Sequence, residues 1–120
     1  MALQLVTNVG WNYTDQSIGI TIPTTQSTIV PATGAVGDSN ITVTTAATVN
    51  LGSLSASAAL TYFCFVNTGT DQLDISFDNG STYENVVPAG GTASGCCVIS
   101  TGIKVKANTS STTYSYALAQ

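Results

Sequence analysis

Three cysteines are the side chains of this sequence best suited to chemistry: Cys64, Cys96 and Cys97 could bind a metal or form a disulfide. A zinc site normally takes four thiolate or imidazole ligands, but the chain has three cysteines and no histidine. Adjacent residues of a strand point to opposite faces, so Cys96 and Cys97 cannot share one pocket in a regular strand. We therefore expect small, buried, reduced thiols. Pairing through Cys64 or between chains is the alternative, and we expect no metal.

Four carboxylates form a second candidate for chemistry, and they are close in sequence at Asp71, Asp74, Asp78 and Glu84. Calcium needs six to eight oxygen ligands, and the loop that follows Asp78 lacks the acidic residues that an EF-hand places later in its loop. Asp74 and Asp78 could in principle form a catalytic carboxylate pair, but both occupy the polar positions of an alternating run. We therefore expect them on the solvent face of a strand and at its hairpin tip.

The charge balance excludes whole classes of function. Lysine and arginine together number 2 against 6 acidic residues, which leaves a net charge of -4 and no histidine in 120 residues. Nucleic-acid binding needs several basic side chains to displace counterions from phosphates, so DNA and RNA are not expected partners. Histidine is the usual general base and metal ligand, so we predict no enzyme, no cofactor and no small-molecule substrate.

The elements that position these residues read as strands. Hydrophobic residues make up 43% of the chain, and apolar and polar residues repeatedly alternate with a period of two. Strands are expected near residues 18–22, 41–51, 61–66, 73–77, 83–87, 94–100, 103–107 and 114–118. The continuous apolar run at 61–66 predicts the most buried strand, and residues 78–81 predict a tight hairpin turn. The pattern predicts an all-β, antiparallel β-sandwich or jelly roll of about eight strands with little or no helix. Residues 54–60 could form either a short helix or an extended connection.

The domain organisation is expected to be simple. A chain of 12.2 kDa has room for one core, and residues 18–120 are expected to form a single β-sandwich domain. Residues 1–17 form a possible N-terminal arm, and the polar stretch 24–40 is expected to be a long loop. The first residues lack the pattern of an export signal, and no apolar run is long enough for a membrane-spanning helix.

Several segments from residue 49 onward carry a resemblance: VNLGSL, YFCFVNTGTDQLDISFDNG, VVPAGG and IKVKANTSSTTYSYAL. Their order resembles small all-β structural proteins of tailed bacteriophages, of the jelly-roll type found in capsid decoration (cement) proteins and related tail components. The resemblance implies a jelly-roll fold and a non-enzymatic place in a virion. Residues 1–48 carry no such resemblance.

The expected function is contact with other proteins. The sequence favours a phage decoration protein, made in the bacterial cytoplasm, that forms a homo-oligomer on the particle surface and binds virion proteins such as the major capsid protein. The candidate partner-binding residues lie outside the resembling segments and are Trp11, Tyr13, Ile29, Val30 and Pro31. A phage tail or adaptor component is one alternative. A carbohydrate-binding or host-binding module with an aromatic platform is the other, although Tyr114 and Tyr116 share a strand face with Leu118 and are expected in the core or at a protein interface.

Overall fold

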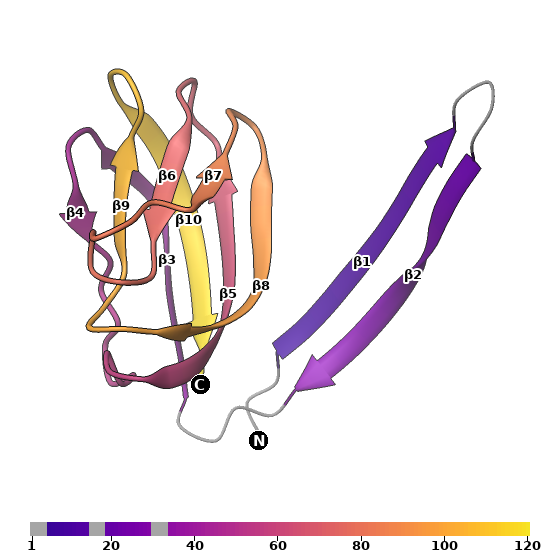
Figure 1. The fold of residues 1–120 in the computed structure, drawn as a ribbon, viewed down its shortest axis with the longest axis horizontal. Helices are drawn as coiled ribbons and strands as arrows, with labels where there is room; N and C mark the ends of the chain where they lie inside the picture. Colours follow the sequence, from indigo (N-terminus) through magenta and orange to yellow (C-terminus); the bar gives the residue numbers. More distant parts are fainter. Residues whose placement is uncertain (1–4, 15–18, 30–33) are drawn as a thin grey trace. The chain divides into compact units, whose positions relative to one another are not determined.

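The protein is a β structure throughout its described part. The computed structural model describes residues 5–14, 19–29 and 34–120, and these contain ten strands and no helix (Figure 1). No described element is a helix long and apolar enough to cross a membrane. The contacts divide the chain into two compact units, Met1–Ala32 and Thr33–Gln120. The all-β prediction is confirmed for the described residues, and residues 54–60 contain no helix.

The first unit contains a two-stranded antiparallel sheet of β1 (Leu5–Thr14) and β2 (Gly19–Ile29). The expected loop at 24–40 is therefore wrong, because strand structure continues past Pro23. Proline lacks the N–H that a ladder needs, and it is tolerated at bulges and sheet edges. The register shifts at this point: Val9 pairs with Thr25, but Trp11 pairs with Ile22. Both strands belong to the unit Met1–Ala32.

The second unit contains eight strands in two antiparallel sheets. Their order along the chain is β3 (Ala35–Val43), β4 (Ala47–Thr48), β5 (Ala59–Asn67), β6 (Leu73–Ser76), β7 (Asn85–Val87), β8 (Thr92–Ile99), β9 (Lys104–Ala107) and β10 (Thr112–Ala119). One sheet has the order β3-β10-β5-β8 and the other β4-β9-β6-β7. The antiparallel pairs are nested, because β6 pairs with β7, β5 with β8, β4 with β9 and β3 with β10. The chain thus forms a folded-over ribbon whose tip is the β6–β7 hairpin.

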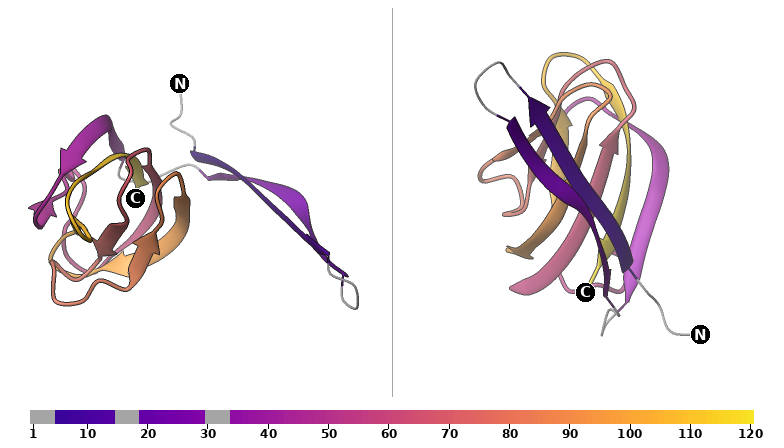
Figure 2. Two further views of the ribbon diagram at one scale, coloured as in Figure 1. Left: turned by 90° about the horizontal axis from the view of Figure 1, so that it is seen from above. Right: turned by 90° about the vertical axis from the view of Figure 1, so that its right-hand side faces the viewer.

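Both sheets of this unit, which Figure 2 shows from two further sides, contribute residues to one hydrophobic core. Phe65 of β5 lies at its centre, fully buried, with its ring stacked on Tyr116 at a centroid distance of 5.9 Å. Tyr114 and Leu118 are also buried, so the prediction that this face of β10 belongs to the core is confirmed. Both sheets supply the other core residues, among them Val43, Leu73, Ile75, Val87, Ile99 and Val105.

The distribution of burial among the strands differs from the prediction. The expected strand at 61–66 is present within β5, but only Thr61 and Phe65 of these six residues are buried and the other four are half-buried. The most buried strand is β6, in which all four residues are buried. The expected strand at 41–51 is interrupted, with β3 ending at Val43 and only two residues in β4.

The hairpin prediction is confirmed. β6 and β7 pair with Leu73 opposite Val87 and Ile75 opposite Asn85. The turn needs left-handed backbone, since Asn79 has φ of 59° and Gly80 has φ of 91°. Asparagine and glycine are the residues that adopt positive φ most readily.

Candidate functional site

The carboxylate of Asp78 closes the loop that connects β6 to β7. The Ser76 hydroxyl donates to Asp78 Oδ1 at 2.6 Å, and the Thr82 hydroxyl donates to Oδ2 at 2.7 Å. The Thr82 N–H also donates to Oδ1 at 2.8 Å. These hydrogen bonds, with that from Ser76 first, lower the pKa of Asp78 to about 2. The group is therefore a fixed anion that organises a turn, and it is a poor proton donor or acceptor near neutral pH.

Asp71 holds two loops together in the same way. The N–H groups of Thr109 and Ser110 both donate to its Oδ2 at 2.7 Å, and the Gln72 N–H donates to Oδ1 at 2.8 Å. The bonds from Ser110 and Thr109 lower the pKa of Asp71. This carboxylate ties the β5–β6 loop to the β9–β10 loop, which is a structural role.

Asp74 corrects the expectation of a solvent-facing carboxylate, because it is only 7% exposed. It lies opposite Lys106 in the β6–β9 ladder, and Gln72 Nε2 donates to its Oδ1 at 2.7 Å. Lys106 Nζ lies 4.4 Å from the centroid of the Tyr83 ring, a cation–π arrangement. The long side chains on this outer face of the sheet explain why Asp74 is buried although it lies in the outward phase of its strand.

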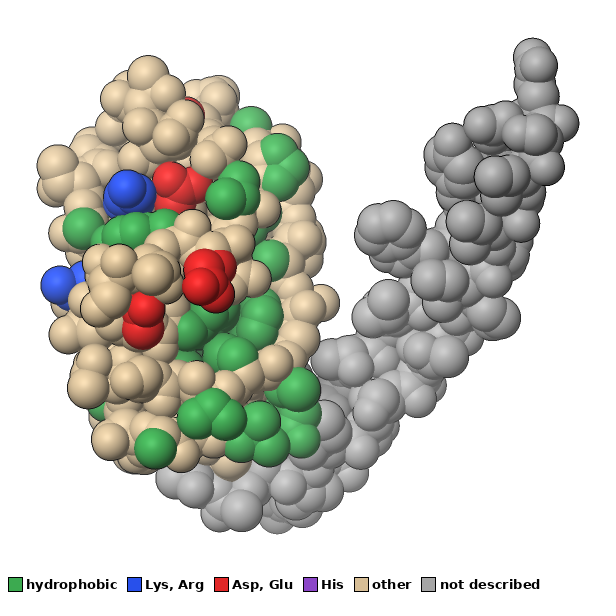
Figure 3. Space-filling model, viewed as in Figure 1, with side chains coloured by type: hydrophobic (Ala, Val, Ile, Leu, Met, Phe, Trp, Pro, Cys, Tyr) green, Lys and Arg blue, Asp and Glu red, His purple; other side chains and the backbone are tan. Residues whose placement is uncertain are grey.

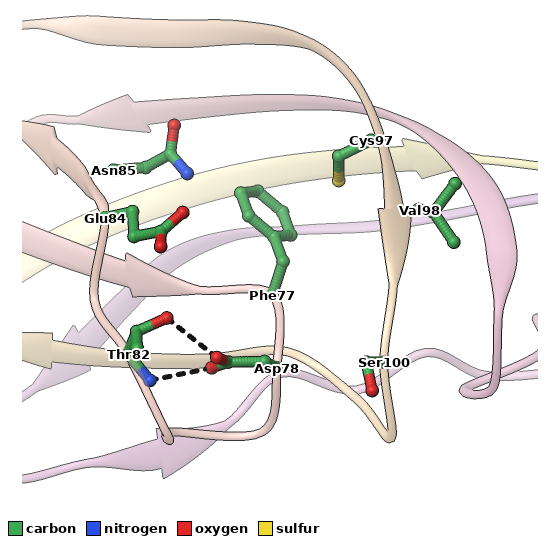
Figure 4. A pocket seen from close by; sticks show the side chains of 8 residues that line it. All are labelled: Phe77, Asp78, Thr82, Glu84, Asn85, Cys97, Val98 and Ser100. Carbon is green, nitrogen blue, oxygen red and sulfur yellow. Dashed lines mark hydrogen bonds between the residues drawn. The ribbon is translucent and has the colours of Figure 1, made fainter.

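A hollow beside this loop is lined by several polar side chains. It has a volume of about 260 Å³ and lies between the β6–β7 loop, the start of β7 and the end of β8 (Figure 4). Its lining residues are Phe77, Asp78, Thr82, Glu84, Asn85, Cys97, Val98 and Ser100. Asp78 is bonded to Thr82, whereas Figure 4 draws no hydrogen bond on Glu84, Asn85 or Ser100. The hollow could therefore accept a polar group of a ligand or partner.

The cysteines correct another expectation. Cys96 is exposed, and Cys64 and Cys97 are half-buried, so none of the three is a fully buried thiol; all three are free. Burial raises the pKa of the Cys64 thiol, and burial followed by the nearby Cys96 raises that of Cys97. A raised pKa keeps a thiol protonated and weakens it as a nucleophile. Among the described residues, no group of three or more potential ligands is placed to hold a metal ion.

The outer face of the β3-β10-β5-β8 sheet differs from that of the other sheet. Its middle strands present small or apolar residues, including Leu60, Cys64 and Val66 of β5 and Ala117 of β10. A shallow hollow of about 290 Å³ lies there, bordered by Cys64, Val66, Ser115 and Ala117. Figure 3 shows hydrophobic side chains gathered toward the side of β8, whereas the acidic and basic ones lie over β6, β9 and the β6–β7 loop.

The sequence-based partner-binding residues belong to the first unit. Trp11 and Tyr13 lie in β1, where they pair with Ile22 and Ile20 of β2, and Ile29 is the last residue of β2. Directly opposed residues share a face of a two-stranded sheet. By register, one face therefore carries Trp11, Tyr13, Ile20 and Ile22. Val30 and Pro31 lie outside the described residues.

The sequence did not predict the hollow near β7 and β8, although Asp78, Glu84 and Cys97 of its lining were candidates for other kinds of site. Phe77 and Val98 read only as alternating strand residues, and nothing in their spacing places them together. Asn67, which directly follows the predicted strand at 61–66, is fully buried and bonded to both sheets. An asparagine that directly follows a continuous apolar run was the one available signal.

No protein-family model, curated protein or solved structure matches this chain.

Proposed function

We propose that this protein is a non-enzymatic structural component of a bacteriophage particle, most specifically a decoration protein that binds the capsid surface. Its second unit is proposed to be a β-sandwich of the jelly-roll type. The proposal is carried by one observation, the nested antiparallel pairing of eight strands into the sheets β3-β10-β5-β8 and β4-β9-β6-β7.

The nested pairing supports a jelly roll because it is what a long two-stranded ribbon produces when it is wound into two facing sheets. Jelly rolls of eight strands are used in viral capsid domains and in lectins. The resemblance of residues 49–120 to phage decoration proteins favours the capsid class. Fold alone does not imply function, so the site must agree with the assignment.

The side-chain chemistry agrees with a binding role. Asp71 and Asp78 are held by loop hydrogen bonds, and the pKa values of the Cys64 and Cys97 thiols are raised. A catalytic site needs a nucleophile or a base poised to exchange a proton. These groups serve the loops or stay protonated, which favours a protein that works through contact.

The two-stranded sheet of the first unit is the proposed attachment element. A two-stranded sheet by itself is marginally stable in water, so binding to a partner would stabilise the sheet formed by the 10 residues of β1 and the 11 of β2. By register, Trp11, Tyr13, Ile20 and Ile22 belong to one face, and Asn12 and Thr21 belong to the other. Aromatic residues are common anchors of protein interfaces. We propose that the face with Trp11 binds the major capsid protein.

The test is binding of the purified protein to particles that lack it. Wild-type protein is expected to sediment with the particles and to raise their resistance to heat. The variant with Trp11→Ala and Tyr13→Ala is expected to bind at least about tenfold more weakly, which corresponds to about 1.4 kcal/mol. The matched control carries Asn12→Ala and Thr14→Ala on the opposite face of the same strand, and it is expected to bind like wild type.

Failure of the wild-type protein to sediment with such particles would refute the decoration role. Equal binding by the two double variants would refute the proposed attachment face. Copy number separates a decoration protein, with hundreds of copies in each virion, from a tail or adaptor component with a few dozen at most. Binding to a glycan array that is lost in the Trp11 variant would instead support a carbohydrate-binding module.

A further inference from the structure

We infer that β8 is a docking edge at which two copies of this chain join, each β8 pairing antiparallel with β8 of the other copy. The inference concerns the surface between copies and holds whether or not the protein belongs to a virion. It follows from a comparison of the four strands that end the two sheets of the second unit, which are β3, β8, β4 and β7.

Three of these four edges carry features that hinder pairing with another strand. β3 is bulged, because Ser39 and Asn40 together oppose Ser115, and Asn40 has φ of 56°. It also carries the exposed charge of Asp38. β4 has two residues, and β7 has three and is followed by Pro88. Bulges, charges, proline and short length are the usual devices that protect an edge strand.

β8 has none of these protections. It runs for eight residues as TASGCCVI, without charge or proline, and its pairing with β5 is regular from Ala59↔Ile99 to Val66↔Thr92. Five of its residues are exposed, and Val98 is 62% exposed. Among the described residues, the backbone of β8 makes no hydrogen bond outside its ladder with β5. Its other row of N–H and C=O groups is therefore available to a further strand.

A second copy fits this edge because β8 is compatible with its own two-fold image. An isologous pair places the same strand on both sides, so a charged edge would bring like charges face to face. The outward row of β8 is Thr92, Ser94, Cys96 and Val98, which avoids that repulsion. Val98 lies beside Leu60, which is 52% exposed, so pairing would also remove apolar surface from water next to the new strand.

The geometry limits the pairing to two registers. A two-fold axis perpendicular to the sheet keeps the outward residues of both copies on the same face, and it places one residue of β8 directly opposite the same residue of the other copy. The two strands overlap along most of their length only if that residue is Gly95 or Cys96, near the middle of β8. With the axis at Cys96, the two Cys96 residues are directly opposed, with Cα atoms about 4.5–5.5 Å apart. With the axis at Gly95, they are diagonal neighbours, about 7–8 Å apart. Cys96 is exposed, so it reports on either register.

The first experiment measures self-association of the full chain by sedimentation equilibrium. Wild-type protein is expected to dimerise reversibly. Cys96→Lys places two ammonium groups at the proposed interface and is expected to weaken dimerisation about tenfold or more. The matched control is Ala117→Lys, which adds the same charge at an exposed position on a middle strand of the same sheet. This control is expected to dimerise like wild type, and Ser94→Lys provides a second edge variant.

The second experiment maps the interface by thiol cross-linking. A variant with Cys64→Ser and Cys97→Ser keeps Cys96 alone and is expected to give a covalent dimer with a short bis-maleimide. Cys96→Ser, which keeps the other two thiols, is expected to give none. A protein that stays monomeric at all concentrations would overturn the inference. So would a dimer that Cys96→Lys leaves intact, or one that Ala117→Lys weakens equally, since another surface would then join the copies.

Discussion

Asn67 is the residue whose replacement tests most directly how the two sheets are held together. It ends β5 and is fully buried, and its side chain reaches a strand of each sheet. Its Nδ2 donates to the carbonyl oxygen of Val87 in β7 at 3.0 Å, and its Oδ1 accepts from the Thr112 hydroxyl of β10 at 2.6 Å. Two further bonds, from Nδ2 to the Asp71 carbonyl and from the Gly69 N–H to Oδ1, are partly buried.

Asn67→Ala is therefore expected to leave two buried polar groups without partners, the Val87 carbonyl and the Thr112 hydroxyl. Each such group costs about 1–3 kcal/mol, so the free energy of unfolding should fall by about 2–6 kcal/mol. The two partly buried bonds can be replaced by water and should add little. Asn108→Ala, which removes an exposed asparagine, is the matched control and should change the stability by less than about 0.5 kcal/mol.

The measurement is urea-induced unfolding at equilibrium, followed by circular dichroism and extrapolated linearly to water. A double-mutant cycle with Thr112→Val isolates the bond between the two side chains and should give a coupling energy of about 0.5–3 kcal/mol. A loss below about 1 kcal/mol for Asn67→Ala, with an unchanged denaturant slope, would refute the reasoning. It would mean that water or a shifted neighbour satisfies the groups left behind.

Three further predictions address other groups. The folded-state pKa of Asp78 is lowered to about 2 from a reference of 3.8, so its carboxylate stabilises the fold above pH 3.8 and loses this effect as the pH falls toward 2. The difference in free energy of unfolding between wild type and Asp78→Asn should therefore disappear over that pH range when unfolding is measured at a series of acid pH values. Cys96 should react with a maleimide faster than the half-buried thiols, whose pKa values are raised, and mass spectrometry should show that Cys96→Ser removes the fast phase. Phe65→Ala should cost about 3–5 kcal/mol in urea unfolding, and a cost below about 1 kcal/mol would mean that the core collapses to fill the site.

The alternation of residue types was enough to predict the strands of the C-terminal half. The Leu73–Ser76 strand, its Asn-Gly turn and the apolar face of Tyr114, Tyr116 and Leu118 all follow from local pattern. These features depend on near neighbours in the chain, since side-chain alternation and positive φ are properties of a few residues. The alternation of residue types did not predict that the strand continues past Pro23. A proline usually ends a strand, but here the register shift between β1 and β2 accommodates it.

The burial of individual polar groups could not be predicted in this way. Asp74 has the alternation of a surface residue, but Gln72 and the neighbouring lysine strand cover it. Cys97 packs against the core whereas Cys96 is exposed on the opposite face of β8, and which face of this strand meets the core depends on how the sheets pack. The hollow near Glu84 exists only because the β6–β7 loop meets the end of β8.

The sequence by itself determined that the chain forms strands, where most of them lie in its C-terminal half, and that histidine-based and polybasic chemistry is absent. Only the tertiary structure decided which strands became neighbours, which edge stayed open and which side chains closed the loops. The physical reason is that strand formation follows from local alternation and turn residues. Strand order and burial arise from contacts between residues distant in the chain, such as Asn67 with Thr112, which no local pattern encodes.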